Sequence, residues 1–437
     1  MIAEDKKWFM QVYSSQPVVF EGGEGVFLRD ALGARYLDFS AQFSACSLGH
    51  NNQELVNALK DQMERLICVS PMFVTKERVQ LARMLARLAP GGLGKCVFGC
   101  TGSDANEFAL KVAKCYRGGG KIISFWRGYH GATAGAAAAT GKAETIQTDR
   151  RIAELLPAGF VHAAPPYCYR CDFGRTYPEC ELFCLEFLET QILHEGEERI
   201  AALIIEPVFA AGGVIVPPDG YLPALRRLCD KHGVLLIFDE VVTGIGRTGK
   251  MFACQHWNVA PDILVSGKAL TGGYIPGSAV IARQDIGEAL DSVVLHGHTH
   301  SAYPLMCASA IKNLEIILRD RLCEHASDVG EYLKSHLLEL KSEFPVIGDV
   351  RGIGLLQGIE IVRDPSTKEP DHELGQVLFE DFLSRGLITE LESRKNLNNC
   401  VIVLHPPLIT QKQHVDMAID IMHRSFRNCL GTRRFEA

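Results

Sequence analysis

Two apolar runs that each lead toward a charged residue constrain the fold more than any other feature of this sequence. The first covers residues 234–238 and leads into Asp239, and the second covers residues 263–265 and is followed by Lys268. Uninterrupted apolar runs of this length are typical of strands that are buried on both faces of a parallel sheet. Because open α/β sheets bind ligands beyond the carboxyl ends of their strands, we expect Asp239 and Lys268 to face one site at that edge.

A lysine and an aspartate at neighbouring strand ends suit the chemistry of pyridoxal 5′-phosphate. The lysine forms a Schiff base with this cofactor, and the carboxylate keeps the pyridine nitrogen protonated, so that the ring withdraws electrons from a bound substrate. Lys268 alone is a weak signal, because most lysines are solvated surface charges. The rest of the sequence must therefore supply the other parts of such a site.

A helix that could bind phosphate is one such part. Residues 96–98 form a short apolar run, and Gly102 and Ser103 follow it at the start of a helical pattern. The N–H groups and the dipole of a helix N-terminus hold phosphate, and glycine lets the backbone approach it. An ordinary helix cap formed by Thr101 or Ser103 would have the same pattern, so this motif alone leaves both interpretations open.

Composition excludes several classes of protein. The 437 residues allow about three domains, or one large α/β domain with a smaller one, and the net charge of −7 predicts no general attraction to nucleic acid or to an acidic membrane. The first seven residues are too charged for a signal peptide, and no apolar run approaches about 20 residues. The 15 cysteines are scattered as reduced thiols would be, so a cytoplasmic location is expected.

Three stretches resemble the class III (ornithine and ω-amino acid type) aminotransferases, which are pyridoxal-phosphate enzymes of fold type I. They are residues 238–249 (FDEVVTGIGRTG), 261–263 (PDI) and 267–268 (GK), and the likeness extends over nearly the whole chain. The resemblance implies an α/β fold. Its large domain has a mixed, mostly parallel sheet flanked by helices, and a small α+β domain is built from both termini.

The expected domain boundaries follow from this likeness. Residues 1–69 contribute to the small domain, residues 70–322 form the large cofactor-binding domain, and residues 323–437 form the C-terminal small domain. Within the first segment, the pattern predicts a short helix near residues 5–13 and short strands at 18–20, 25–29 and 35–39.

The resemblance also implies a role for individual residues. Lys268 and Asp239 are the catalytic pair, Tyr129 packs against the cofactor ring, and Thr299 reaches the phosphate of a neighbouring subunit. The implied cofactor-binding residues are Gly102, Ser103, Tyr129, His130, Asp239, Val241, Val242, Lys268 and Thr299. Shared active sites of this kind imply a homodimer or a dimer of dimers.

On the substrate side the chain departs from the family pattern. Gln42 and Glu206 match residues that line the substrate side, although a loop glutamine in solvent and a carboxylate that caps a loop have the same sequence signal. Val242 stands where many members have a glutamine that bonds the cofactor. Val403 stands where enzymes for α-amino acids often have a carboxylate-binding arginine, and Arg394 is the candidate that could replace it.

These residues predict an aminotransferase that moves an amino group from an amine or ω-amino acid type donor to an α-keto acid through a Lys268 Schiff base. The alternative is an ammonia-lyase or phospho-lyase on the same scaffold that acts on a β-substituted aminoethyl compound, or a decarboxylating transaminase. A non-catalytic relative is disfavoured by the intact Lys268 and Asp239. A nicotinamide dehydrogenase is disfavoured because residues 118–120 lack the G-x-G-x-x-G spacing.

No metal is assigned from the sequence. Cys168, Cys171, Cys180 and Cys184 have the ligand number of a structural zinc site, but the middle gap is shorter than in common zinc modules, and packed thiols are the favoured interpretation. Three alternating histidines at 296, 298 and 300 have no accompanying carboxylate motif.

Overall fold

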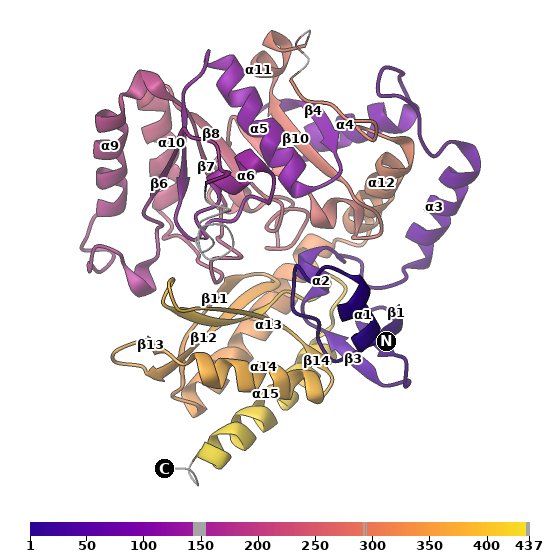
Figure 1. The fold of residues 1–437 in the computed structure, drawn as a ribbon, viewed down its shortest axis with the longest axis vertical. Coiled ribbons are helices and arrows are strands. Elements are labelled where there is room, and N and C mark those ends of the chain that lie inside the picture. Colours follow the sequence, from indigo (N-terminus) through magenta and orange to yellow (C-terminus); the bar gives the residue numbers. More distant parts are fainter. Residues whose placement is uncertain (143–153, 292, 294, 434–437) are drawn as a thin grey trace.

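The computed structural model describes residues 1–142, 154–291, 293 and 295–433. Figure 1 shows a larger part with a central sheet between helices, and below it a smaller part in which both chain termini lie. The expected combination of a large α/β domain with a small α+β domain is therefore present. The boundaries at residues 69/70 and 322/323 stay predictions.

The central sheet carries the two runs that end in Asp239 and Lys268. Its seven strands are, in spatial order, β4 (Leu93–Gly99), β10 (Ser278–Arg283), β9 (Ile263–Ser266), β8 (Leu235–Asp239), β7 (Ile200–Ile205), β5 (Lys121–Phe125) and β6 (Phe160–Ala163). Strand β10 is antiparallel to both of its neighbours, and the other strands pair in parallel. Every residue of β7, β8 and β9 is buried, as the apolar runs predict.

Helices cover both faces of this sheet because successive residues of each strand point to opposite sides. Leu235 and Ile237 of β8 pack in one apolar cluster with α5 (Gly102–Tyr116), whereas Leu236 and Phe238 pack in another with α10 (Tyr221–His232). The further helices of this part are α3 (Gln53–Arg65), α4 (Lys76–Leu88), α6 (Ala134–Ala139), α9 (Phe183–Glu195), α11 (Gln284–Ala289) and α12 (Pro304–Arg319). The layers are visible in Figure 1.

The small part contains two sheets. One has the order β11 (Ile347–Ile353), β12 (Leu356–Asp364), β16 (Asn399–Leu404) and β15 (Glu390–Arg394), with β13 (Glu369–Pro370) paired to β12. The other has the order β1 (Phe20–Glu24), β2 (Phe27–Asp30), β3 (Arg35–Asp38) and β14 (Leu387–Ile388). Its last strand pairs in parallel with β3, so one sheet joins the two ends of the chain.

Five helices complete the small part and the N-terminal segment. They are α1 (Ile2–Trp8), α2 (Ala41–Ser44), α13 (Leu322–Glu343), α14 (His372–Ser384) and α15 (Lys412–Arg433). The N-terminal helix begins and ends earlier than the predicted 5–13, and β1 begins where the predicted strand 18–20 ends. In both places the local pattern is short, and tertiary pairing decides where the element lies.

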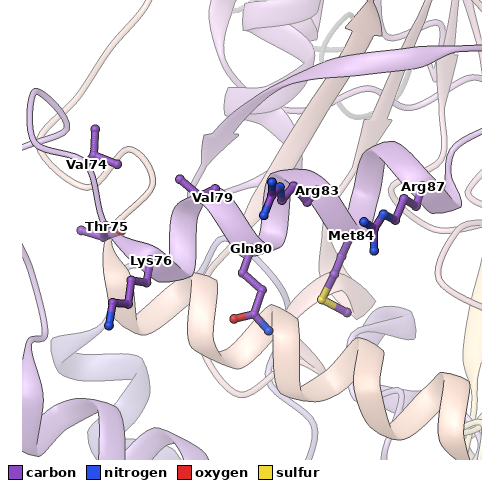
Figure 2. A pocket seen from close by; sticks show the side chains of 8 residues that line it. All are labelled: Val74, Thr75, Lys76, Val79, Gln80, Arg83, Met84 and Arg87. Carbon is purple, nitrogen blue, oxygen red and sulfur yellow. The ribbon is translucent and has the colours of Figure 1, made fainter.

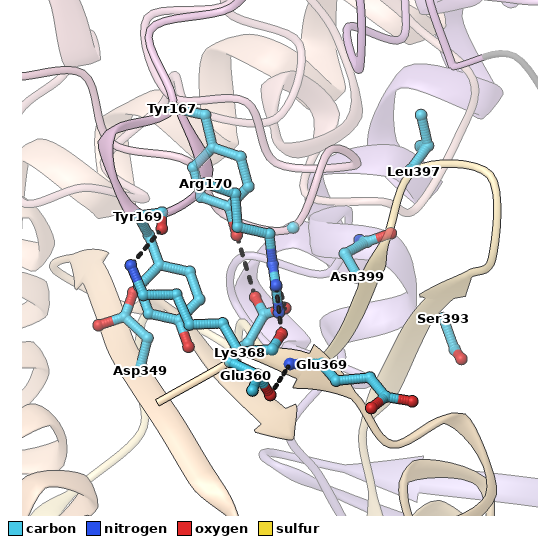
Figure 3. A network of polar contacts seen from close by, with 12 residues as sticks. Tyr167, Tyr169, Arg170, Asp349, Glu360, Lys368, Glu369, Ser393, Leu397 and Asn399 are labelled. Carbon is cyan, nitrogen blue, oxygen red and sulfur yellow. Dashed lines mark hydrogen bonds and ion pairs between the residues drawn. The ribbon is translucent and has the colours of Figure 1, made fainter. Parts of the chain in front are cut away.

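A buried charge network connects the two parts (Figure 3). Glu360 of β12 is fully buried and accepts hydrogen bonds from Arg170 Nη2 at 2.8 Å, Arg351 Nη2 at 2.7 Å and Tyr167 Oη at 3.1 Å. Arg170 and Tyr167 belong to the large part, where they follow β6, and Arg351 comes from β11 of the small part. Because an unpaired buried carboxylate would be strongly destabilising, these donors fix the small part against the large one.

One general property concerns membranes. Among the helices that the structure describes, none combines the length and the apolar character needed to cross a bilayer.

Candidate active site

Lys268 lies where the apolar run predicted, just beyond the carboxyl end of β9. It begins a single helical turn, Lys268–Thr271, and its φ of 42° lies in the left-handed region that side-chain-bearing residues rarely adopt. Burial lowers the pKa of Lys268, and the carboxylates of Glu390, Glu206 and Asp239 act against this shift, in that order. The ammonium form is therefore less favoured than in water, which suits an amine that must react as a nucleophile or base.

Asp239 ends β8, and three donors fix its carboxylate. Oδ2 accepts hydrogen bonds from Asn106 Nδ2 at 2.7 Å and from His130 Nδ1 at 2.8 Å, and Oδ1 accepts the N–H of Val241 at 3.0 Å. The side chains of Asp239 and His130 are almost fully buried. A carboxylate that accepts this many hydrogen bonds is held in one orientation and can accept one further donor at Oδ1.

Gly102 and Ser103 form the first turn of α5, next to the Lys268 loop. Thr101 caps this helix, since its side chain accepts the N–H of Asp104 at 3.1 Å. A Cβ on Gly102 would lie 2.9 Å from Cγ1 of Val241, and one on Gly131 would lie 2.5 Å from Oγ of Ser103. Glycine is therefore needed at both places, and the result is a tight backbone cradle at a helix N-terminus, where anions bind.

Tyr129 and Glu206 come from neighbouring strand ends and contact each other. Glu206 Oε1 accepts the backbone N–H of Tyr129 at 2.9 Å, and Oε2 accepts the N–H of Ala210 at 3.1 Å. Burial, together with the nearby Asp239, raises the pKa of Glu206 to about 7. Burial also raises the pKa of the half-buried Tyr129, with smaller effects from Tyr13 and Asp239. These shifts mark Tyr129 and Glu206 as parts of one enclosed site with Asp239.

These residues fit pyridoxal 5′-phosphate on three counts. The α5 N-terminus is an anion cradle that only glycine leaves open at Gly102, Asp239 is an oriented acceptor for a ring N–H, and Lys268 is an amine with a lowered pKa. All three come from residues within the described ranges, and together they supply a phosphate end, a ring end and a covalent anchor.

The two valines at which the chain departs from the family pattern lie in one apolar cluster. Val242, just after β8, packs in this cluster with Val403 and Val401 of β16 and with Val208. The contact between the end of β8 and the small part is therefore apolar at both positions.

Charged residues that the sequence did not single out also lie here. Lys142 Nζ lies 2.7 Å and 2.6 Å from the two carboxylate oxygens of Glu392, and His405 Nε2 lies 2.8 Å from Glu390. The charge of Glu390 raises the pKa of Lys268 and the charge of Lys142 lowers it, so both groups lie near this lysine. The one sequence signal was the alternation of Glu390, Glu392 and Arg394, which has the period of a strand.

The remaining predicted residues lie at the periphery. Gln42 is exposed and donates from Nε2 to Asp38 at 3.2 Å, and Arg394 lies 3.8 Å from Glu392. Thr299 is exposed on the protomer. The roles of these three residues stay predictions.

Among the described residues, no group of three or more histidine, cysteine or acidic side chains is arranged to hold a metal ion. Cys168, Cys171, Cys180 and Cys184 all line one small cavity beside Phe173 and Tyr177, and all four are free thiols. His296 and His298 each contact Asp104, at 2.5 Å and 2.9 Å.

A surface groove of about 660 Å³ lies away from this site (Figure 2). Its lining comes from α4 and the residues just before it, with Arg83, Arg87 and Gln80 beside Val79 and Met84. None of the residues assigned to the cofactor lines it, so this groove is not the catalytic centre.

Known proteins of one enzyme family are similar to this chain over most of its length. The family model for aminotransferase class-III covers residues 9–426. An adenosylmethionine-8-amino-7-oxononanoate aminotransferase of Geobacter sulfurreducens is 37% identical over 95% of this chain and 93% of its own length. A leucine/methionine racemase of Thermococcus litoralis is 35% identical over 94% of this chain and 90% of its own length.

A solved structure extends the likeness to three dimensions. An amine transaminase from an uncultivated Pseudomonas species, in its PLP-bound form, superposes with a TM-score of 0.89 at 32% identity, covering 97% of this chain and 99% of that one. The predicted fold type I is thereby confirmed. The chain belongs to the class III aminotransferases and is an enzyme of that family.

Proposed function

We propose that Lys268 holds pyridoxal 5′-phosphate covalently and that the enzyme transfers an amino group from an amine or ω-amino acid type donor to an α-keto acid. The observation that carries this proposal is the oriented Asp239 carboxylate, fixed by His130 and Asn106, beside a buried lysine with a lowered pKa. When bound, the cofactor supplies an electron-withdrawing ring that weakens the C–H bond next to the amine.

The residues of this chain then divide the work. The N–H groups at Gly102 and Ser103 would hold the phosphate, and the Asp239 carboxylate would accept the ring N–H. Tyr129, fixed through its N–H by Glu206, packs against the ring. Lys268 would serve as the base that removes the proton from the substrate carbon and returns it at another position.

The choice of donor follows from the departures at Val242 and Val403. A valine at 403 cannot hold a carboxylate, so donors whose α-carboxylate must be bound there are disfavoured. Arg394 is the residue proposed to contact the carboxylate of the keto acid, and Gln42 is proposed to contact the substrate from the other side. The expected donors are therefore amines and ω-amino compounds.

A homodimer with shared active sites is part of the proposal. Several large apolar side chains of the N-terminal region are exposed on the protomer: Trp8 (76%), Met10 (85%), Met72 (84%) and Phe73 (61%). Exposed apolar groups of this size mark interaction surfaces. The exposed Thr299 would contact the phosphate held by the partner.

One experiment tests the reaction type. The yellow, cofactor-loaded protein is mixed with a panel of amines without any keto acid, and both the cofactor spectrum and free ammonia are followed. A transaminase is expected to convert one equivalent of cofactor and release no ammonia. Continuous ammonia release with an unchanged cofactor band would contradict transamination and assign elimination. Exchange of stereochemistry without either signal would assign racemisation.

The test variant is Lys268→Ala. Its matched control is Lys250→Ala, since Lys250 is an exposed lysine of the same domain. Lys268→Ala is expected to fold, to lose the band of covalently held cofactor and to lose turnover. Lys250→Ala is expected to behave as the wild type. Full activity of Lys268→Ala would contradict the role proposed for this lysine.

A further inference from the structure

Glu390 lies directly opposite Val403 in the antiparallel pair of β15 with β16. Directly opposed residues place their side chains on the same face of a sheet, about 5 Å apart. Val403 packs in the apolar cluster that contains Val242, so this face is turned toward the end of β8, where Asp239 lies. A carboxylate therefore stands beside the position at which a carboxylate-binding arginine was expected.

The cations on this face are already engaged. Lys142 contacts both oxygens of Glu392 within 2.7 Å, and Arg394 lies 3.8 Å from the same carboxylate. Both positive charges therefore lie against Glu392. Glu390 is the acidic group of this face that is left over.

The only charge-capable partner of Glu390 within 4 Å, among the residues described, is His405 at 2.8 Å. Burial lowers the pKa of His405, so the imidazole is neutral at neutral pH. Its Nδ1 lies 2.5 Å from the hydroxyl oxygen of Ser44. His405 therefore lies against Glu390 without cancelling its charge.

Glu390 is ionised and shares the site with Lys268. Burial alone would raise the pKa of Glu390, but the hydrogen bond from His405 and the charges of Lys268 and Lys142 hold it below its usual range. Among the carboxylates that support the charged form of Lys268, Glu390 acts most strongly. With a cofactor held by Lys268, this negative charge would be available to a cation on the substrate.

Resting on the proposed function, we propose that Glu390 binds a second, positively charged amino group of the donor, so that the enzyme prefers diamines to monoamines and to ω-amino acids. The distal ammonium group would meet an oriented, ionised carboxylate with a neutral partner. A distal carboxylate would be repelled by the same group. Recognition of such a carboxylate by Lys142 or Arg394 is the opposite outcome, and it requires one of them to leave Glu392.

The test uses three donors of equal chain length: n-butylamine, 1,4-diaminobutane and 4-aminobutanoate. Each is mixed at pH 8 with the cofactor-loaded wild type without any keto acid, and the rate of loss of the cofactor band gives a second-order rate constant. At this pH the distal amine is protonated. The diamine is expected to react at least roughly tenfold faster than either other donor, as one charge-assisted hydrogen bond allows.

The variant Glu390→Gln keeps the shape of the side chain beside His405 but removes the charge. The ratio of the diamine rate to the monoamine rate is expected to fall by at least roughly tenfold. Glu369→Gln, which alters a surface carboxylate of the same domain, is expected to keep the wild-type ratio. An unchanged ratio in Glu390→Gln would overturn the inference.

The outcomes separate the inference from the proposed function. If no amine converts the cofactor, the proposed function fails, and the inference falls with it. If amines convert the cofactor but 4-aminobutanoate or n-butylamine reacts as fast as the diamine, only the inference fails. Because the wild-type panel decides this by itself, the result does not depend on whether Glu390→Gln folds.

Discussion

His130 Nδ1 lies 2.8 Å from Oδ2 of Asp239, and both side chains are almost completely shielded from solvent. Asn106 donates to the same oxygen and also to the backbone carbonyl of His130, in each case within 2.8 Å. Two residues, Asn106 of α5 and His130 of the loop after β5, thus fix one carboxylate oxygen of Asp239 at the end of β8. The other oxygen, Oδ1, accepts the N–H of Val241 and has room for one further donor.

Asp239→Asn is expected to lower kcat by roughly tenfold to a hundredfold, because a neutral amide does not stabilise a protonated ring nitrogen. The NH₂ group of the new asparagine would also face an N–H group of Asn106, His130 or Val241, so that two donors would meet. Steady-state kinetics at saturating cofactor measures this effect. Asp219→Asn, at an exposed aspartate of the same domain, serves as the control, and an Asp239→Asn enzyme as fast as that control would contradict the assignment.

Gly102→Ala is expected to weaken cofactor binding and to reduce the free energy of unfolding by about 1–3 kcal/mol. The new methyl group would lie 2.9 Å from a methyl of Val241, a stiff β-branched side chain. The double variant Gly102→Ala with Val241→Ala removes that contact, so it should recover most of the lost affinity. Titration of the cofactor-free protein, followed by fluorescence, measures both variants. If the second substitution restores nothing, the steric explanation is wrong.

The raised pKa of Glu206 predicts that the free energy of unfolding depends on pH. Burial raises its pKa to about 7, whereas the unfolded chain has an ordinary value near 4.5. The folded state keeps this proton between those values, so the contribution of Glu206 is complete below pH 4.5 and is lost as the pH rises toward 7. Between pH 5 and pH 8 this loss amounts to at most about 3 kcal/mol.

Urea unfolding of the wild type and of Glu206→Gln at pH 5 and pH 8 isolates this contribution. The variant is expected to be less stable at pH 5, because its amide NH₂ faces the N–H of Tyr129 or Ala210. Its loss of stability between the two pH values should be smaller than that of the wild type. Equal losses in both proteins would show that Glu206 does not titrate in this range.

Hybrid dimers test the sharing of active sites. Thr299→Val and Lys268→Ala are each expected to give nearly inactive homodimers, the first because it loses a phosphate contact. A hybrid of the two chains pairs an intact Lys268 with an intact Thr299 at one of its two sites. Refolding an equal mixture should therefore restore about a quarter of the wild-type activity, since half of the dimers are hybrids. Activity no higher than that of the separate variants would exclude a shared site.

The strands that lead to Asp239 and Lys268 were predictable, because β8 and β9 are buried on both faces and therefore consist of apolar runs. The position of Gly102 and Ser103 at the start of α5 was predictable from the sequence, whereas their contact with a phosphate stays a prediction. Glu390 and Glu392 were not predictable in this way. Strand β15 has acidic residues at positions where a buried strand normally has apolar ones, so it lacks the alternation of apolar and polar residues that indicates a strand. The pair of Lys142 with Glu392 spans 250 residues, and no local pattern contains such a contact.

The parallel pairing of β14 with β3 has a consequence for the order of biosynthesis. The N–H groups of Leu37 and Phe39 bond to the carbonyl groups of Gly386 and Ile388, about 350 residues further along the chain. At ordinary rates of translation, roughly 20–70 s pass between the synthesis of these two strands. The first three strands therefore wait with an open edge while the large domain folds, and a chain released before residue 388 would carry that edge exposed to other nascent chains.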